Sequence, residues 1–179
     1  MRTALRAGQA GLGALMVLTA IASASAAPAT CSAFKAAFLK STADLKSSFV
    51  RPLIVSRRGP SKDDIFQLVL SAQIDGTLHC RGETLERFQA QVTSSASGDL
   101  ATSFERVQVA ALMAAFKWNK ARALGVSKKI NAEASEYLQA SIQSGDVVFS
   151  GKTERHEIGG DVGMMWTPAQ HTFVIVDED

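Results

Sequence analysis

Two cysteines, Cys31 and Cys80, are the side chains best suited to covalent chemistry in this 179-residue sequence. Cys80 directly follows His79, within the stretch GTLHCRGE. A cysteine beside a histidine has three interpretations: a nucleophile with its base, a pair of metal ligands, or one half of a disulfide bond. We expect residues 77–81 to form a strand, and successive side chains of a strand point to opposite faces. His79 and Cys80 should therefore point apart.

A disulfide bond between Cys31 and Cys80 is the interpretation that the cysteine count favours. With only two cysteines the pairing is unambiguous, and disulfides persist in compartments outside the cytoplasm. The bond would close a loop of 49 residues. On the loop-entropy model it stabilises the fold by about 4 kcal/mol.

A cysteine nucleophile is the enzymatic alternative. The stretch Cys31-Ser-Ala-Phe at a predicted helix start, with residues 144–149 and His156 far downstream, resembles in part the papain-like cell-wall amidases. The resemblance implies a Cys-dependent hydrolase of amidase or peptidase type. In that family the segment between cysteine and histidine is compact, whereas about 125 residues separate Cys31 from His156 here. His171, which precedes an apolar run, is the other candidate base. We expect no catalytic residue among these.

A copper site is the cofactor alternative. Four potential ligands lie within a short C-terminal segment: His156, Met164, Met165 and His171. Thioether and imidazole ligands suit Cu(I), and the face of Trp166 could lie against the cation. Met164 and Met165 are neighbours on a predicted strand, however, so both could bind one ion only through a bulge or loop. We therefore expect no metal and no other cofactor.

Other common sites lack their sequence signatures. The acidic pairs have no spacing that places two carboxylates in one site, and no Cys/His spacing matches structural zinc. The glycines at 159, 160 and 163 do not follow a strand and open a helix, as a dinucleotide-binding motif requires.

The first 26 residues have the layout of a cleaved secretory signal peptide. Arg2 and Arg6 precede an apolar run over residues 11–22 and an A-x-A site at 24–26. This run is shorter than the roughly 20 residues of a membrane-spanning helix. We therefore expect one periplasmic or secreted domain over residues 27–179, with no membrane span after cleavage.

The charge of the mature chain excludes some partners. The net charge of +2 comes from 19 basic and 17 acidic residues, and the predicted signal peptide removes two arginines and no acidic residue. The mature chain is then formally neutral. Nucleic acids attract a strong basic excess, so we expect a protein or a small ligand as the partner instead.

The elements that position these residues follow from hydrophobic periodicity and turn signals. Helices are expected over residues 31–45, 102–124 and 128–143, and strands over 52–56, 65–74, 77–81, 86–93, 147–149, 162–166 and 172–176. Asp75 and Gly76 predict the turn of the first hairpin. Thr102 and Glu105 predict a capping box, and Gly125 predicts a helix end.

The elements are grouped into blocks of strands and helices rather than alternating. This order predicts an α+β fold: a mostly antiparallel sheet of about five to seven strands, with an N-terminal helix and two central helices packed on it. The function expected from sequence is that of an exported, non-catalytic binding or accessory protein. The Cys-dependent hydrolase and the periplasmic copper-binding protein remain alternatives.

Overall fold

The computed structural model describes residues 30–45, 53–58, 64–145, 151–157 and 160–176, and only the backbone of 53–58 and 151–157. The predicted signal peptide and the predicted strand at 147–149 lie outside these residues. The elements run in the order α1 (Cys31–Asp44), β1 (Leu53–Arg58), β2 (Asp64–Ser71), β3 (Ile74–Arg81), β4 (Thr84–Thr93), α2 (Gly98–Phe116), α3 (Lys120–Ser144), β5 (Gly151–Glu157), β6 (Gly160–Trp166) and β7 (Gln170–Val176).

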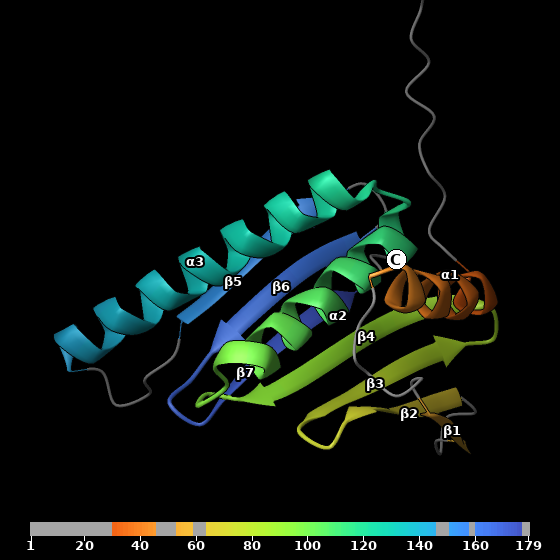
Figure 1. Cartoon of the computed structure of the whole chain (residues 1–179), viewed down its shortest axis with the longest axis horizontal. Helices are drawn as coiled ribbons and strands as arrows, with labels where there is room; N and C mark the ends of the chain where they lie inside the picture. The colour runs from red at the N-terminus through yellow and green to blue at the C-terminus, as the bar shows by residue number, and fades with distance from the viewer. Residues whose placement is uncertain (1–29, 46–52, 59–63, 146–150, 158–159, 177–179) are drawn as a thin grey trace, which may run out of the picture.

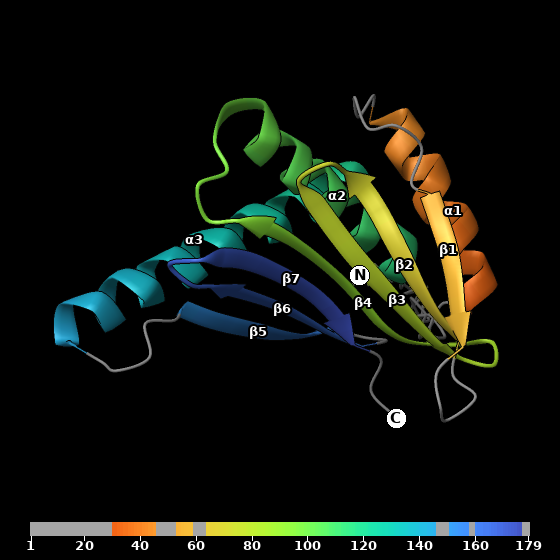
Figure 2. The ribbon, with the colours of Figure 1, turned by 90° about the horizontal axis from the view of Figure 1, so that it is seen from below.

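The strands form one antiparallel sheet in the order β1-β2-β3-β4-β7-β6-β5. It consists of two meanders, β1 to β4 and β5 to β7, whose last strands pair with each other at the middle. Ala90 of β4 lies opposite Phe173 of β7 at the centre of this junction. All three helices cover the same face of the sheet (Figures 1 and 2). The α+β fold predicted from the sequence is confirmed.

The core lies between the helices and this face of the sheet. Alternate residues of β3 point into it, so that Ile74, Leu78 and Cys80 are at most 1% exposed. Phe34 and Phe38 of α1 are stacked with ring centroids 5.8 Å apart, and both pack on Phe88 of β4. Burial of these large apolar side chains is the main force that holds α1 on the sheet.

The first hairpin turns at a different place from the one predicted. Ala72 and Gln73 form the turn, whereas Asp75 and Gly76 lie inside β3. The Ser71 hydroxyl accepts hydrogen bonds from the N–H groups of Gln73 and Ile74. Starting the strand at Ile74 buries this residue in line with Leu78, and that burial outweighs the local turn preference of Asp-Gly.

The two central helices also have other bounds than predicted. α2 begins at Gly98, and the Thr102 hydroxyl donates to the Gly98 carbonyl inside the helix instead of capping it. The break between α2 and α3 falls at Lys117, whose φ is 54°. Gly125, predicted to end a helix, lies inside α3 instead.

Aromatic packing and a cap explain the position of this break. The ring of Trp118 is stacked on Phe116 with centroids 4.7 Å apart, and the Arg122 guanidinium lies 4.2 Å from the ring centroid of Trp118. The Asn119 side chain caps α3 by accepting from the N–H of Arg122 at 2.9 Å. These contacts fix a sharp turn where sequence periodicity predicts a continuing helix.

Candidate functional site

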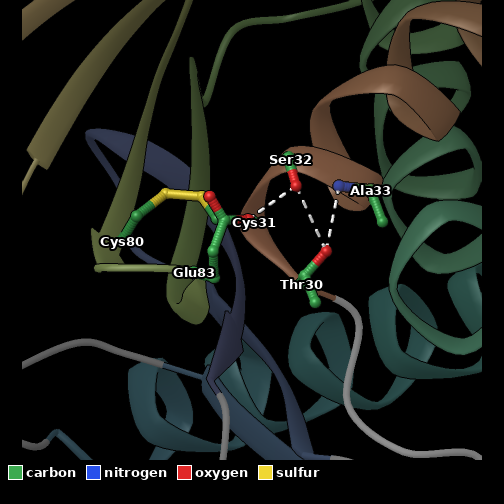
Figure 3. Close-up of a disulfide and its surroundings, with 6 residues drawn as sticks. All are labelled: Thr30, Cys31, Ser32, Ala33, Cys80 and Glu83. Carbon is green, nitrogen blue, oxygen red and sulfur yellow. Dashed lines mark hydrogen bonds between the residues drawn. A yellow bond between two sulfur atoms is a disulfide. The ribbon is translucent and has the colours of Figure 1, made fainter.

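The two cysteines form the predicted disulfide bond, which joins α1 to β3 (Figure 3). Both cysteines are at most 2% exposed. The turn between β3 and β4 holds the start of α1 as well: the Cys31 N–H donates to the Glu83 carbonyl at 2.7 Å, and the Ser32 hydroxyl donates to the Glu83 carboxylate at 2.6 Å. Thr30 caps the helix, accepting from the N–H of Ala33. This region is therefore a structural clamp.

The residues of the hydrolase alternative are far apart. Thr30, next to Cys31, pairs with Thr84 at one end of β4, whereas His171 pairs with Val92 near the other end. Eight residues of a strand span on the order of 25 Å. Neither cysteine carries a free thiol. His171 therefore cannot act as the base for Cys31 in this arrangement.

The copper candidates are separated as well. Met164 is buried under the helices, whereas Met165 is 37% exposed on the opposite face of the sheet. The backbone of His156 lies opposite Asp161, at the far end of β6 from the Trp166 and His171 pair. Within the described part of the chain, no group of three or more His, Cys, Asp or Glu side chains could hold a metal ion.

A pocket of about 370 Å³ lies between α2, α3 and the helix-covered face of the sheet. The first half of α2 lines one side with Glu105 and Gln108, and α3 lines another with Lys128 and Asn131. Trp166 and His171 form the wall that the sheet contributes. The pocket thus combines side chains that lie more than 60 positions apart in the sequence, and its volume is at the lower end of the range for small-molecule sites.

A buried amide network builds the inner part of the pocket. Gln108 is fully buried, and its Oε1 accepts from the Ser127 hydroxyl at 2.6 Å and from Asn131 Nδ2 at 2.7 Å. Its Nε2 faces much weaker acceptors, Asn131 Oδ1 at 3.5 Å and Met164 Sδ at 3.7 Å. The two short bonds to Oε1 fix the orientation of the Gln108 amide. Its Nε2 group is left with only the two long contacts.

The sheet wall of the pocket consists of two stacked rings. The rings of Trp166 and His171 lie 3.8 Å apart between centroids and within 14° of parallel. The indole nitrogen of Trp166 is buried, and no described residue accepts a hydrogen bond from it. Burial lowers the pKa of His171 below its ordinary value, because desolvation disfavours the imidazolium form. The imidazole is therefore mostly neutral at pH 7.

Two side chains of opposite charge also line this pocket. Glu105 projects from α2 and Lys128 from α3. Among the described residues, neither of them forms an ion pair with the other or with a third residue. The lining of the pocket thus includes one half-buried acidic residue, Glu105, and one exposed basic residue, Lys128, and neither has an ionic partner among the described residues.

A second hollow, of about 280 Å³, lies on the face of the sheet that no described helix covers. Residues of β4, β6 and β7 line it, among them Gln89, Gly163, Met165, Thr172 and Val174. It contains no buried polar group without a partner among the described residues. The pocket between the helices and the sheet is therefore the stronger candidate for a binding site.

From the sequence, two residues of this pocket, Trp166 and His171, are candidates, but both are assigned to a copper site and His171 also to a hydrolase. Glu105 and Gln108 lie on the helix predicted over residues 102–124, and no motif in the sequence marks Glu105 or Lys128 as part of a site. Gln108 in the sequence RVQVAALMAAF carries the one usable signal, since a lone amide on an otherwise apolar face needs hydrogen-bond partners.

Comparisons of the chain with protein-family models, curated proteins and solved structures found no match. In the described part of the chain, no helix is long and apolar enough to cross a membrane.

Proposed function

We propose that this protein is an exported, non-catalytic binding protein that holds a small ligand in the pocket between α2, α3 and the sheet. The observation that carries the proposal concerns Trp166, which lines the pocket: its indole N–H is buried and has no acceptor among the described residues. Nearly all buried polar groups in native proteins are hydrogen-bonded. Because this nitrogen is closed off from solvent, an acceptor atom of a bound ligand would reach it through a small shift of the Trp166 ring or of the side chains that cover it.

Two further observations support the proposal. The pocket is lined by both apolar and polar groups, including the weakly bonded Nε2 of Gln108, and this mixture is typical of small-molecule sites. The buried disulfide fits an oxidising compartment, and the signal-like sequence at residues 1–26 supports export to the periplasm or outside the cell.

The proposal is tested by replacing each of the two tryptophans with phenylalanine. A mixed panel of small metabolites is screened by thermal shift, and the affinity of each hit is then measured by calorimetry. We expect Trp166→Phe to weaken binding about 2- to 10-fold, because it removes one hydrogen bond and keeps the ring. Trp118→Phe is the matched control, since Trp118 does not line this pocket, and should leave affinity unchanged.

The proposal also predicts how Trp166→Phe affects the stability of the protein without ligand. Without ligand, Trp166→Phe should not reduce the free energy of unfolding through a lost hydrogen bond, because the protein supplies no acceptor to lose. A panel in which nothing binds, or hits that bind Trp166→Phe as tightly as the unmodified protein, would contradict the proposed function.

A further inference from the structure

The charges within the pocket restrict the chemistry of its ligand. Glu105 and Lys128 both line it, and among the described residues each lacks an ionic partner. Glu105 is half-buried, so a cationic group beside it is screened less by water than at an open surface. A ligand with only a negative charge would be repelled by the Glu105 carboxylate. A ligand with only a positive charge would be repelled by the Lys128 ammonium group.

A ligand that carries one positive and one negative group can form an ion pair with each of the two side chains. Its ammonium group would meet the Glu105 carboxylate, and its carboxylate would meet the Lys128 ammonium. Charge-assisted hydrogen bonds of these types are stronger than neutral ones. His171 lies against Trp166 and is mostly neutral at pH 7, so it adds no net charge to this balance.

We propose that the pocket binds a small zwitterion of the α-amino acid class, with Glu105 and Lys128 as the residues that recognise its two charged groups. This inference rests on the proposed function and deepens it. The volume of about 370 Å³ limits the ligand to a free amino acid or a molecule of similar size. Gln108, fixed by Ser127 and Asn131, supplies the polar wall behind it.

The experiment measures binding of a panel of free L- and D-amino acids to the full chain by calorimetry. The best binder is then compared with its N-acetyl derivative, which lacks the ammonium charge, and with its carboxamide, which lacks the carboxylate. We expect each derivative to bind about tenfold more weakly or worse, because each loses one charged interaction.

Two variants that remove one charge each show which residue meets which charged group of the ligand. Glu105→Gln should weaken binding of the free amino acid about tenfold while adding no further loss for the N-acetyl derivative, since the interacting pair is already broken. Lys128→Gln should do the same for the carboxamide. The matched controls are Lys129→Gln and Glu136→Gln, exposed positions of α3 that do not line the pocket, and both should bind normally.

The outcomes separate this inference from the proposed function. Absence of binding by every amino acid in the panel overturns the inference, as does binding that Glu105→Gln and Lys128→Gln leave unchanged. If a ligand without two charges then binds in the wider screen and is weakened by Trp166→Phe, the proposed function stands and only the zwitterion is wrong.

Discussion

Gln108 is the polar residue through which the otherwise apolar face of α2 contributes to the pocket. It is fully buried on a helix whose neighbouring side chains are apolar, and both of its short hydrogen bonds go to α3. An apolar side chain at this position would leave the Ser127 hydroxyl without this acceptor, and the Asn131 amide with the Ser127 carbonyl alone. Gln108 therefore fixes both the spacing of the helices and the polarity of the pocket.

His171 makes the stability of the protein depend on pH. Its pKa is lowered in the folded state, whereas it is about 6.5 in an unfolded chain. Between the two values the unfolded state binds the extra proton, so the free energy of unfolding falls as the pH drops below about 6.5 and levels off below the folded pKa. Glu105 and Lys128, the charged residues of the same pocket, offset each other in sign.

The variant His171→Phe isolates this effect. It keeps an aromatic ring against Trp166 and removes the titrating group, so we expect a smaller loss of stability between pH 7 and pH 5 than in the unmodified protein. Urea unfolding at a series of pH values measures it. An identical pH dependence in both proteins would show that another group is responsible.

At the scale of elements, replacing glycine with alanine should have opposite effects on the free energy of unfolding at Gly125 and at Gly76. Gly125 is exposed inside α3, and an added Cβ there would meet nothing within 4 Å. Alanine loses less chain entropy than glycine on entering a helix, so Gly125→Ala should raise the free energy of unfolding by about 0.5–1 kcal/mol.

Gly76→Ala is the matched comparison. The Cβ added to β3 would lie 2.8 Å from the Gln89 backbone oxygen on the neighbouring strand, so the sheet must shift. We expect it to destabilise the fold by about 1–3 kcal/mol. Chemical unfolding of both variants gives the comparison, and a destabilising Gly125→Ala or a neutral Gly76→Ala would contradict this account.

The elements also show what the sequence predicts well. Strict alternation in β3 correctly assigns Leu78 and Cys80 to the buried face and places Arg81 in solvent. Hydrophobic periodicity correctly places α1 and the ends of the sheet strands to within a few residues. Local turn signals fail where burial competes with them, as at Asp75 and Gly76. The strand β5, with the polar sequence GKTERHE, has no periodic signal and was missed.

The pocket could not be predicted for a different reason. Its walls come from α2, α3 and the β6–β7 end of the sheet, and the sequence does not encode which helix faces which strand in any short pattern. Only the pairing of Trp166 with His171 across β6 and β7, together with the contact of Gln108 with α3, brings these residues into one site.

At the scale of the whole molecule, the disulfide ties α1 covalently to a sheet that α1 also contacts through aromatic packing on Phe88 and hydrogen bonds to Glu83. Replacing both Cys31 and Cys80 with serine should lower the free energy of unfolding by about 4 kcal/mol, because the 49-residue loop is released in the unfolded chain. Urea unfolding measures the loss, and thiol titration of the unmodified protein should find no free thiol until a reductant is added.

Ser32→Ala is the control for this prediction. It removes the hydrogen bond to Glu83 in the same clamp but leaves the disulfide intact, and both residues are exposed. Its effect should be no more than about 1 kcal/mol. Equal stability of the oxidised protein and the double serine variant would contradict a structural role for the bond.

The order of strands in the sheet has a consequence for how the chain folds. β7 is the last of the seven strands among the described residues, yet it lies between β4 and β6 and joins the two meanders. Until residues 170–176 are available, β4 and β6 share no neighbour, and closing the sheet requires contacts between distant segments, which form slowly. The first meander therefore cannot become part of the finished sheet before the last described strand is present, and folding of the whole sheet depends on the C-terminal end of the described chain.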